Sequence, residues 1–148
     1  MDIFFGHLAL IIAAAFAGAA IYVNTVEQPA RLRLDDSALL TEWKPSYKRG
    51  FAMQASLALA GTLCGVAAWF DKEESGFLAG AILLFANWPW TLIAIRPTNN
   101  KLMAMDPAEQ NPRVRQLVQR WGMLHAVRSA LGVAATLAFF FTSISVVQ

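Results

Sequence analysis

Four long apolar stretches limit the fold of this chain more than any other feature of its sequence. They lie at about 3–23, 51–70, 76–95 and 124–147 in a chain of 148 residues. A helix needs about 20 mostly apolar residues to cross the roughly 30 Å hydrocarbon core of a bilayer. Hydrophobic residues make up 57% of the chain and charged residues 15%, so little sequence is left for a separate soluble domain. We therefore predict one all-α domain over residues 1–148, an integral membrane four-helix bundle.

The basic residues are concentrated in two of the three predicted connections. Residues 24–50 and 96–123 contain ten of the 12 Lys and Arg residues, whereas the turn 71–75 contains one beside three acidic residues. Short loops rich in Lys and Arg stay on the cytoplasmic side of a membrane. We therefore predict that both long connections are cytoplasmic and that the N and C termini are on the non-cytoplasmic side. Topology then accounts for the net charge of +2, and nucleic acid is not expected as a partner.

Prolines and capping residues mark the predicted ends of the helices. The first helix has no basic segment before it and is expected to be retained, and to end at Glu27-Gln28-Pro29. Asp35 is expected to cap a short helix that Lys44-Pro45 stops. The pairs Asp106-Pro107 and Asn111-Pro112 both have the order of a helix cap followed by proline. The fourth helix should therefore begin near one of them.

The second and third apolar stretches each contain two glycines spaced four residues apart. Gly61 and Gly65 lie in the second stretch, and Gly76 and Gly80 in the third. Small residues at this spacing let two membrane helices approach closely. We therefore expect the second and third helices to pack through these faces within the chain.

Trp121, His125 and Arg128 are spaced to lie on one face of the fourth helix. An arginine at the centre of a bilayer costs about 2.5–3.5 kcal/mol, so Arg128 should face the bundle and find a partner, unless it reaches back to the headgroups. His125 has three open roles: a structural hydrogen bond, a catalytic group, or a single haem ligand, which leaves no spacing signature. His7 lies about 20 Å away in depth at the helical rise and Cys64 stands alone, so no metal site is predicted.

Polar and aromatic side chains from all four helices gather at the predicted cytoplasmic end. They include Glu27, Tyr47, Arg49, Thr98, Asn99, Trp121 and His125. Pro89 should kink the third helix, and Asn87 is placed to bind the backbone carbonyl that the proline leaves without a donor. The preference of Lys and Arg for the cytoplasmic side of the membrane does not explain why Glu27, Tyr47, Asn99 and His125 gather at the same end. We therefore predict a cytoplasm-facing pocket with aromatic walls.

Four segments carry a resemblance to a known family. They are Glu27-Gln28-Pro29-Ala30-Arg31, Trp43 with Tyr47-Lys48-Arg49-Gly50, Pro97-Thr98-Asn99-Asn100-Lys101-Leu102, and Trp121-Gly122-Met123-Leu124-His125-Ala126-Val127-Arg128. With these segments in this order, nearly the whole chain resembles the anthrone oxygenase-like family of small four-helix membrane proteins, whose bacterial members are mostly uncharacterised. Fungal members are associated with the oxidation of polyketide anthrones to anthraquinones by dioxygen, without an added cofactor. The resemblance implies a membrane oxygenase, expected here in a bacterial inner (plasma) membrane.

The resemblance also implies roles for individual residues. His125 would be the base that removes a proton from the acidified methylene of an anthrone, and Arg128 and Asn99 would stabilise the oxyanion. The implied substrate-binding residues are Glu27, Trp43, Tyr47, Arg49, Trp88, Thr98 and Trp121. The substrate would be a lipophilic aromatic or quinone-like molecule taken from the cytoplasmic leaflet. No cofactor is predicted.

Two other classes of function remain open from the sequence. One is a non-catalytic accessory subunit of a larger membrane complex, with the polar cluster serving assembly. The other is a protein that binds a lipid, a quinone or a haem, alone or as a homo-oligomer. A transporter is not expected, because the four spans show no inverted repeat and no charged path at the midplane.

Overall fold

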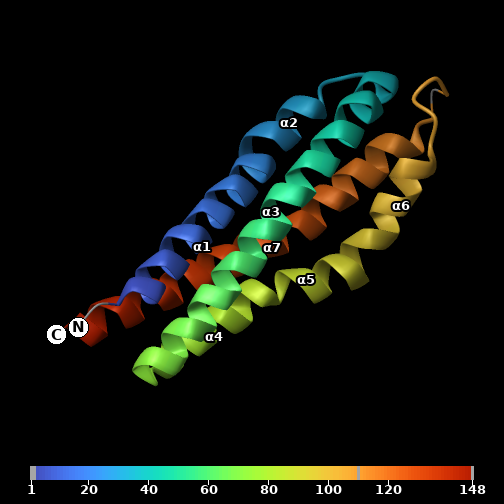
Figure 1. The fold of residues 1–148 in the computed structure, drawn as a ribbon. Coiled ribbons are helices and arrows are strands. Elements are labelled where there is room, and N and C mark those ends of the chain that lie inside the picture. Colours follow the sequence, from blue (N-terminus) through green and yellow to red (C-terminus); the bar gives the residue numbers. More distant parts are fainter. Residues whose placement is uncertain (1–2, 110, 148) are drawn as a thin grey trace.

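The computed structural model of the chain describes residues 3–109 and 111–147, so residues 1, 2, 110 and 148 of the predicted domain lie outside the described part. The described ranges contain four long helices and no strand, and Figure 1 shows these helices running side by side. Their apolar segments are Phe4–Arg31, Asp36–Lys72, Ser75–Ala104 and Arg113–Val146, each long and apolar enough to cross a membrane. The predicted fold class, an all-helical membrane bundle, is therefore confirmed.

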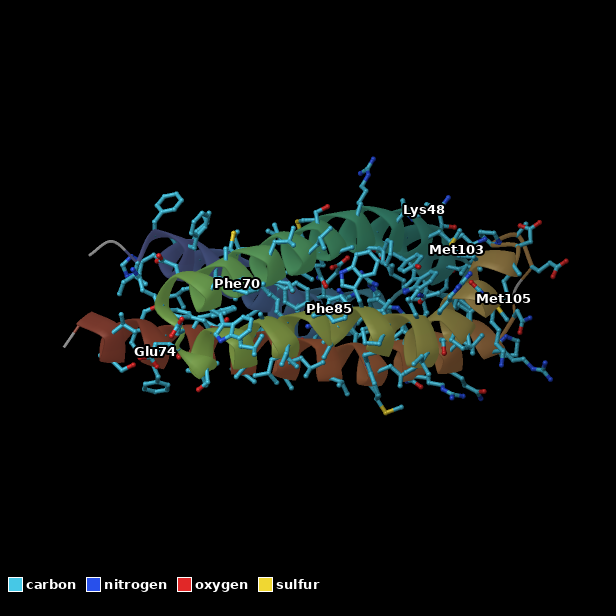
Figure 2. All side chains as sticks on the ribbon, turned by 60° about the horizontal axis from the view of Figure 1, so that its bottom comes forward. Lys48, Phe70, Glu74, Phe85, Met103 and Met105 are labelled. Carbon is cyan, nitrogen blue, oxygen red and sulfur yellow. The ribbon has the colours of Figure 1, made fainter. Side chains whose placement is uncertain are left out.

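Within residues 3–109 and 111–147 the helices consist of nine elements. They are α1 (Phe4–Tyr22), η1 (Val23–Glu27), α2 (Gln28–Arg31), α3 (Asp36–Lys72), α4 (Ser75–Phe85), α5 (Asn87–Trp90), η2 (Thr91–Ile95), α6 (Arg96–Ala104) and α7 (Arg113–Val147), where η1 and η2 are π-helical turns. Both chain ends and the α3–α4 turn lie at one end of the bundle, which we call the terminal end, and the opposite end is the connection end (Figure 1). Figure 2 shows Phe70 and Glu74 toward the terminal end, and Lys48, Met103 and Met105 toward the connection end. Which end faces the cytoplasm stays a prediction.

The predicted end of the first helix at Pro29 is wrong, because the helix continues to Arg31. The π-turn η1 precedes Pro29, and the backbone N–H of Gln28 donates to the carbonyl of Val23. The third helix repeats this arrangement, with η2 ahead of Pro97. Proline has no N–H to donate and its ring crowds the preceding turn. A wider turn just before it lets the helix continue.

The predicted stop at Lys44-Pro45 is also wrong, because α3 runs without a break through Pro45. Thr41, whose carbonyl loses its helical donor at Pro45, is exposed, and so is the proline itself. Water can therefore bind that carbonyl. The segments that link the long helices are residues 32–35 and 105–112, so the predicted connections 24–50 and 96–123 between the membrane spans are largely helical, and their position outside the membrane stays a prediction.

The predicted caps explain where two helices begin. The Asp35 carboxylate accepts a hydrogen bond from the backbone N–H of Ala38 at 2.9 Å and starts α3. The Asn111 side chain accepts from the N–H of Arg113 at 3.0 Å and starts α7. Asp106 makes the same kind of contact in the preceding turn. The second of the two cap-then-proline pairs therefore starts the fourth helix.

Small residues bring the helices together in the half of the bundle near the terminal end. A Cβ on Gly80 would lie 2.5 Å, and one on Gly65 2.7 Å, from atoms of the Phe139 ring. A Cβ on Gly61 would meet the side chain of Leu84 in the same way. The glycines of the second helix pack against the third as predicted, whereas Gly76 and Gly80 of the third helix face Thr142 and Phe139 of α7. The buried core of this terminal half is Ile3, Ala9, Ala13, Phe16, Ala20, Ala58, Ala68, Phe77, Ala81, Leu84, Ala135 and Phe139.

A second core fills the half of the bundle near the connection end. Its buried residues are Leu39, Leu40, Trp43, Ile95, Leu102, Val114, Val118 and Trp121. Among the described residues, this core contains two tryptophans and no alanine, whereas alanines make up most of the core of the terminal half. This connection half contains both π-turns and most of the buried polar side chains.

Candidate functional site

A cavity lies in the connection half, and side chains from all four helices line it. Its space is about 430 Å³ with the mouth included, of which about 40 Å³ admits the centre of a water molecule. The lining residues are Val23, Glu27, Arg31, Ser46, Tyr47, Gly50, Phe51, Gln54, Thr91, Ile95, Asn99, Trp121, His125 and Arg128. We call this cavity the polar pocket.

His125 lines the polar pocket and is held by Asn24. The amide nitrogen of Asn24 donates to the carbonyl of Gly122 at 2.9 Å, which turns the Asn24 oxygen toward His125. That oxygen lies 2.9 Å from His125 Nδ1 and also accepts from the Ser129 hydroxyl at 2.8 Å. An amide oxygen only accepts hydrogen bonds, so Nδ1 carries the proton of the imidazole. In the neutral ring this leaves Nε2 with a free lone pair, as a base requires.

Arg128 faces the bundle, as predicted, with only 7% of its surface exposed. Its guanidinium lies over the ring of Phe16, with 5.5 Å between the guanidinium carbon and the ring centroid. The expected polar partner is not found: Nε has no hydrogen-bond partner among the described residues, and no carboxylate pairs with Arg128 there. A buried cation without an anion is costly. An anionic or strongly polar ligand in the pocket would offset that cost.

Two buried amides add to the unsatisfied polar groups of the pocket. Gln54 and Asn99 are each 2% exposed. Their side-chain oxygens have no partner within the described part of the chain. Buried amide groups normally have hydrogen-bond partners. Together with Arg128, they indicate that this cavity binds a polar edge of a ligand or water.

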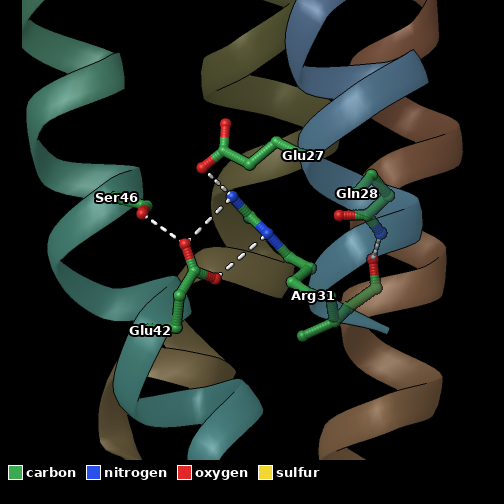
Figure 3. A network of polar contacts seen from close by, with 6 residues as sticks. Glu27, Gln28, Arg31, Glu42 and Ser46 are labelled. Atoms are coloured by element: carbon green, nitrogen blue, oxygen red, sulfur yellow. Dashed lines mark hydrogen bonds and ion pairs between the residues drawn. The ribbon is translucent and has the colours of Figure 1, made fainter. Parts of the chain in front are cut away.

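Arg31 forms a buried ion cluster on another wall of the pocket, shown in Figure 3. It pairs with Glu27 one turn earlier on the same helix, and its Nε lies 3.1 Å from Glu42 of α3. The Ser46 hydroxyl donates to Glu42 at 2.5 Å. The Arg31 guanidinium also lies over the ring of Trp121, 5.7 Å from its centroid. The cluster ties the first helix to α3 at the depth of the pocket.

Stacked aromatic rings form the wall behind His125. The ring of Trp121 lies 4.9 Å from that of His125, at an interplanar angle of 29°. Trp43 meets Trp121 edge-on at 5.9 Å and stacks on Tyr47 at 4.9 Å. Tyr47 and Phe51 are only half-buried. The inner rings are therefore fixed by packing, whereas the outer two border the mouth of the pocket.

Side chains of the first and third helices bind backbone carbonyls of α7 and set its position. Besides Asn24, Gln28 donates to Val118 at 2.8 Å, and the Trp90 indole donates to Leu124 at 2.9 Å. Because these carbonyls flank Trp121 and His125, the contacts aim that face of α7 at the pocket.

The third helix bends where Pro89 was expected to kink it. The amide of Asn87 donates to the carbonyl of Leu84 at 3.0 Å, and the Thr91 hydroxyl donates to the carbonyl of Asn87 at 2.7 Å. The carbonyl that Pro89 leaves without a helical donor is that of Phe85, four residues earlier. Asn87 therefore does not fill the role expected for it and binds the neighbouring carbonyl of Leu84. Figure 1 shows the third helix turning away from α3 at α5. This divergence leaves the space in which the pocket lies.

The structure brings together six of the ten residues predicted for the site. Glu27, Tyr47, Asn99, Trp121, His125 and Arg128 line the polar pocket. Trp43 is fully buried behind it, and Thr98 is buried without lining it. Trp88 lines a second, neighbouring cavity. Arg49 is exposed on α3, so its predicted place in the pocket is wrong. On the helix α3, Tyr47, Gly50 and Gln54 are spaced three and four residues apart and share the face toward the pocket. Arg49 lies on another face and points outward.

Four polar residues that build the site were not among the predicted site residues. Gln28 and Arg31 lie in the segment 27–31 that carries the family resemblance but were given no role, and Asn24 and Gln54 carried no motif. The sequence signal that points to Gln54 is an amide side chain inside an otherwise apolar span. The described residues contain no group of three or more His, Cys, Asp and Glu side chains that could hold a metal ion.

Comparison with known proteins gives consistent matches over most of the chain. The family model described as Anthrone oxygenase matches residues 43–138. An anthrone oxygenase of Claviceps purpurea is 30% identical over 154 aligned positions, covering 94% of this chain and 88% of that protein. Anthrone oxygenase tpcL of Aspergillus fumigatus is 32% identical, with 82% of this chain and 81% of the relative covered. Anthrone oxygenase dmxR16 of a Cryptosporiopsis species is 29% identical over 82% of this chain and 78% of the relative. No solved structure matches the fold.

Proposed function

The chain belongs to the anthrone oxygenase family, and we propose that it is a membrane oxygenase that converts an anthrone-like aromatic substrate to the corresponding quinone with dioxygen. The names of the fungal relatives support the reaction class. The polar pocket is the candidate site for this reaction. The observation that carries the proposal is the pairing, in one pocket, of a histidine with a free Nε2 and an arginine without an anionic partner.

The chemistry requires a base and a cation but no external reductant. An anthrone has a methylene group between two aromatic rings, acidified by conjugation to a carbonyl opposite. Loss of one proton gives an anion that can reduce dioxygen and form a carbon–oxygen bond. Cleavage of the O–O bond, with loss of the second hydrogen, leaves a carbonyl and water. One methylene and one dioxygen thus become one carbonyl and one water, and the substrate supplies all the electrons.

In the proposed mechanism, residues of the polar pocket supply the base, the stabilising charge and the wall that binds the rings. His125 Nε2 removes the methylene proton, because Asn24 holds the proton of the ring on Nδ1. Arg128 and the amide of Asn99 stabilise the negative charge that moves to the substrate oxygen. Trp121 offers a flat wall against which the aromatic rings lie. A three-ring substrate exceeds the enclosed part of the pocket, so the half-buried Tyr47 and Phe51 must move aside when it binds.

The charge distribution supports a cytoplasmic position for the connection end. Arg33, Lys48, Arg49, Lys101, Arg113 and Arg120 are exposed there, and the positive-inside rule favours the cytoplasm for such an end. The substrate would then enter from the cytoplasmic leaflet. The relatives named above are fungal, so a bacterial inner membrane stays a prediction from the earlier resemblance.

Turnover by purified protein in nanodiscs tests the proposal. Quinone absorbance and dioxygen uptake are followed with a hydroxylated anthrone, and the spontaneous oxidation is subtracted. We expect H125A to lower kcat by about 10²–10⁴-fold through loss of the base. R128M should lower it by about 10²–10³-fold through loss of the cation.

Two exposed residues provide matched controls for these variants. H7A removes the other histidine, and R120M removes an exposed arginine two turns before Arg128 on α7. Both should keep full activity. Activity retained in H125A and R128M would contradict the catalytic roles. Inactivity of the wild-type protein without a co-purifying partner would favour the accessory-subunit alternative. A Soret band lost in H125A would favour haem binding.

A further inference from the structure

A second cavity adjoins the polar pocket on the side of the bundle midpoint. It lies between α3 and the bent third helix, has about 260 Å³ of space, and is lined almost wholly by apolar atoms. Phe51, Thr91 and Arg128 line both cavities, so the two cavities are neighbours. We call it the apolar pocket.

Almost no polar surface faces the apolar pocket, although Asn87 Oδ1, Trp88 Nε1 and Arg128 Nε of its wall residues have no hydrogen-bond partner among the described residues. The Asn87 amide nitrogen binds the Leu84 carbonyl, and the Thr91 hydroxyl binds the Asn87 carbonyl. The remaining wall includes Ala55, Trp88 and Leu92. About 10 Å³ of the cavity admits the centre of a water-sized molecule, which is room for about one small molecule. An apolar cavity of this size does not hold water well.

The apolar pocket borders the outer surface of the bundle. Leu92 in its wall is 49% exposed, and Ala55 and Trp88 are half-buried. In a membrane helix that outer surface faces lipid. Dioxygen is apolar and diatomic, and it is more soluble in hydrocarbon than in water. A small apolar cavity with a lipid-facing wall therefore suits dioxygen better than water or an ion.

We propose that the apolar pocket is the dioxygen site of this protein, filled sideways from the bilayer, and that Arg128 stabilises the superoxide formed there. The inference rests on the proposed function and adds the position of the second substrate. The anion in the polar pocket passes one electron to dioxygen, which gives a carbon radical and superoxide with the total charge unchanged. The two then combine in a carbon–oxygen bond. Arg128 lines both cavities and has no carboxylate partner, so its positive charge is available when the superoxide forms.

Filling the apolar pocket tests the proposal kinetically. A55F places a ring in the cavity from α3, whereas A60F places the same ring on an exposed position of that helix. With saturating anthrone and varied dioxygen, we expect A55F to raise the KM for dioxygen about tenfold while the KM for the anthrone stays unchanged. A60F should match the wild type. The smaller change A55L gives an intermediate shift and replaces A55F if that variant folds poorly.

A second measurement detects dioxygen in the pocket without any turnover. The protein is labelled with 5-fluorotryptophan, and W88F identifies the ¹⁹F signal of Trp88. Because dioxygen is paramagnetic, the ¹⁹F relaxation rate of Trp88 should be higher under oxygen than under nitrogen. A55F should abolish this difference in rate, whereas A60F should leave it unchanged. Equal relaxation in both variants, or a raised KM for the anthrone in place of dioxygen, would overturn the proposal. A protein that shows the relaxation but never oxidises an anthrone would contradict the proposed function and leave the dioxygen site standing.

Discussion

In the terminal half of the bundle the helices touch through alanine and glycine, whereas in the connection half arginine, tryptophan and glutamine side chains stand between them. The terminal half packs Phe139 directly onto Gly65 and Gly80. The connection half buries Arg31, Gln54 and several other polar groups around a cavity. Close packing excludes both water and ligand, so a site can form only where the helices diverge. In this protein the divergence begins at the bend of the third helix.

The largest expected effect comes from disturbing the close packing. G80L should lower the free energy of unfolding by about 3 kcal/mol, because the new side chain meets the ring of the fully buried Phe139. G18L is the matched control, since nothing lies within 4 Å of a Cβ at Gly18. Thermal unfolding in detergent measures both variants. Similar midpoints for the two would mean that the terminal half is less tightly packed than described.

Removing the cation of the buried cluster should have the next largest effect. R31M leaves Glu27 and Glu42 without their shared cation, and we expect a loss of about 2 kcal/mol, because both carboxylates keep some access to solvent. The exposed R33M should change nothing. Adding E27Q and E42Q to R31M should restore most of the stability, because the whole cluster is then neutral. A triple variant as unstable as R31M would show that packing against Trp121, not charge, is what Arg31 contributes.

Changing the residue that orients His125 should affect activity more than stability. N24L removes the acceptor for His125 Nδ1, and we expect kcat to fall about tenfold to a hundredfold with little change in KM. N24D retains an acceptor and should keep more of the activity. The ¹⁵N chemical shifts of the imidazole report the tautomer directly. An unchanged Nδ1–H tautomer in N24L would contradict the positioning role of Asn24.

The smallest effect is expected at Arg49, which the sequence placed in the pocket and the structure places outside it. Arg49 is exposed and lines neither cavity. R49A should therefore change the free energy of unfolding by less than about 0.5 kcal/mol, and it should leave kcat/KM unchanged. A marked loss of turnover would show that Arg49 folds over the pocket when substrate binds.

Much of the bundle could be predicted because membrane helices follow local rules. Length and apolarity defined the spans, the glycine spacing in the second helix indicated its packing face, and the Asp35 and Asn111 caps indicated two helix starts. The prolines misled the prediction, because a helix can continue beyond a proline. At Pro29 a π-turn lets the helix continue, and at Pro45 the exposed carbonyl of Thr41 can bind water in place of its helical donor.

The site could be predicted only in part, because its key contacts join residues far apart in the chain. The spacing of Trp121, His125 and Arg128 was enough to place them on one face. Nothing local to Asn24 indicates a hydrogen bond to a residue 101 positions later. Gln54 likewise becomes a wall of the cavity only because the third helix bends away from α3.

The π-turn at Thr91–Ile95 has a consequence for helical phase. In an unbroken α-helix, Asn99 would point roughly 120° around the axis from Asn87. The π-turn contains one extra residue, which reduces this angle by about 100°. Asn87, Thr91, Ile95 and Asn99 consequently form one straight row, and all four are buried. Deleting a single residue from this turn would rotate α6, and with it Asn99, about the helix axis and out of line with Asn87. The third helix should therefore tolerate a substitution in this turn more readily than a change of its length.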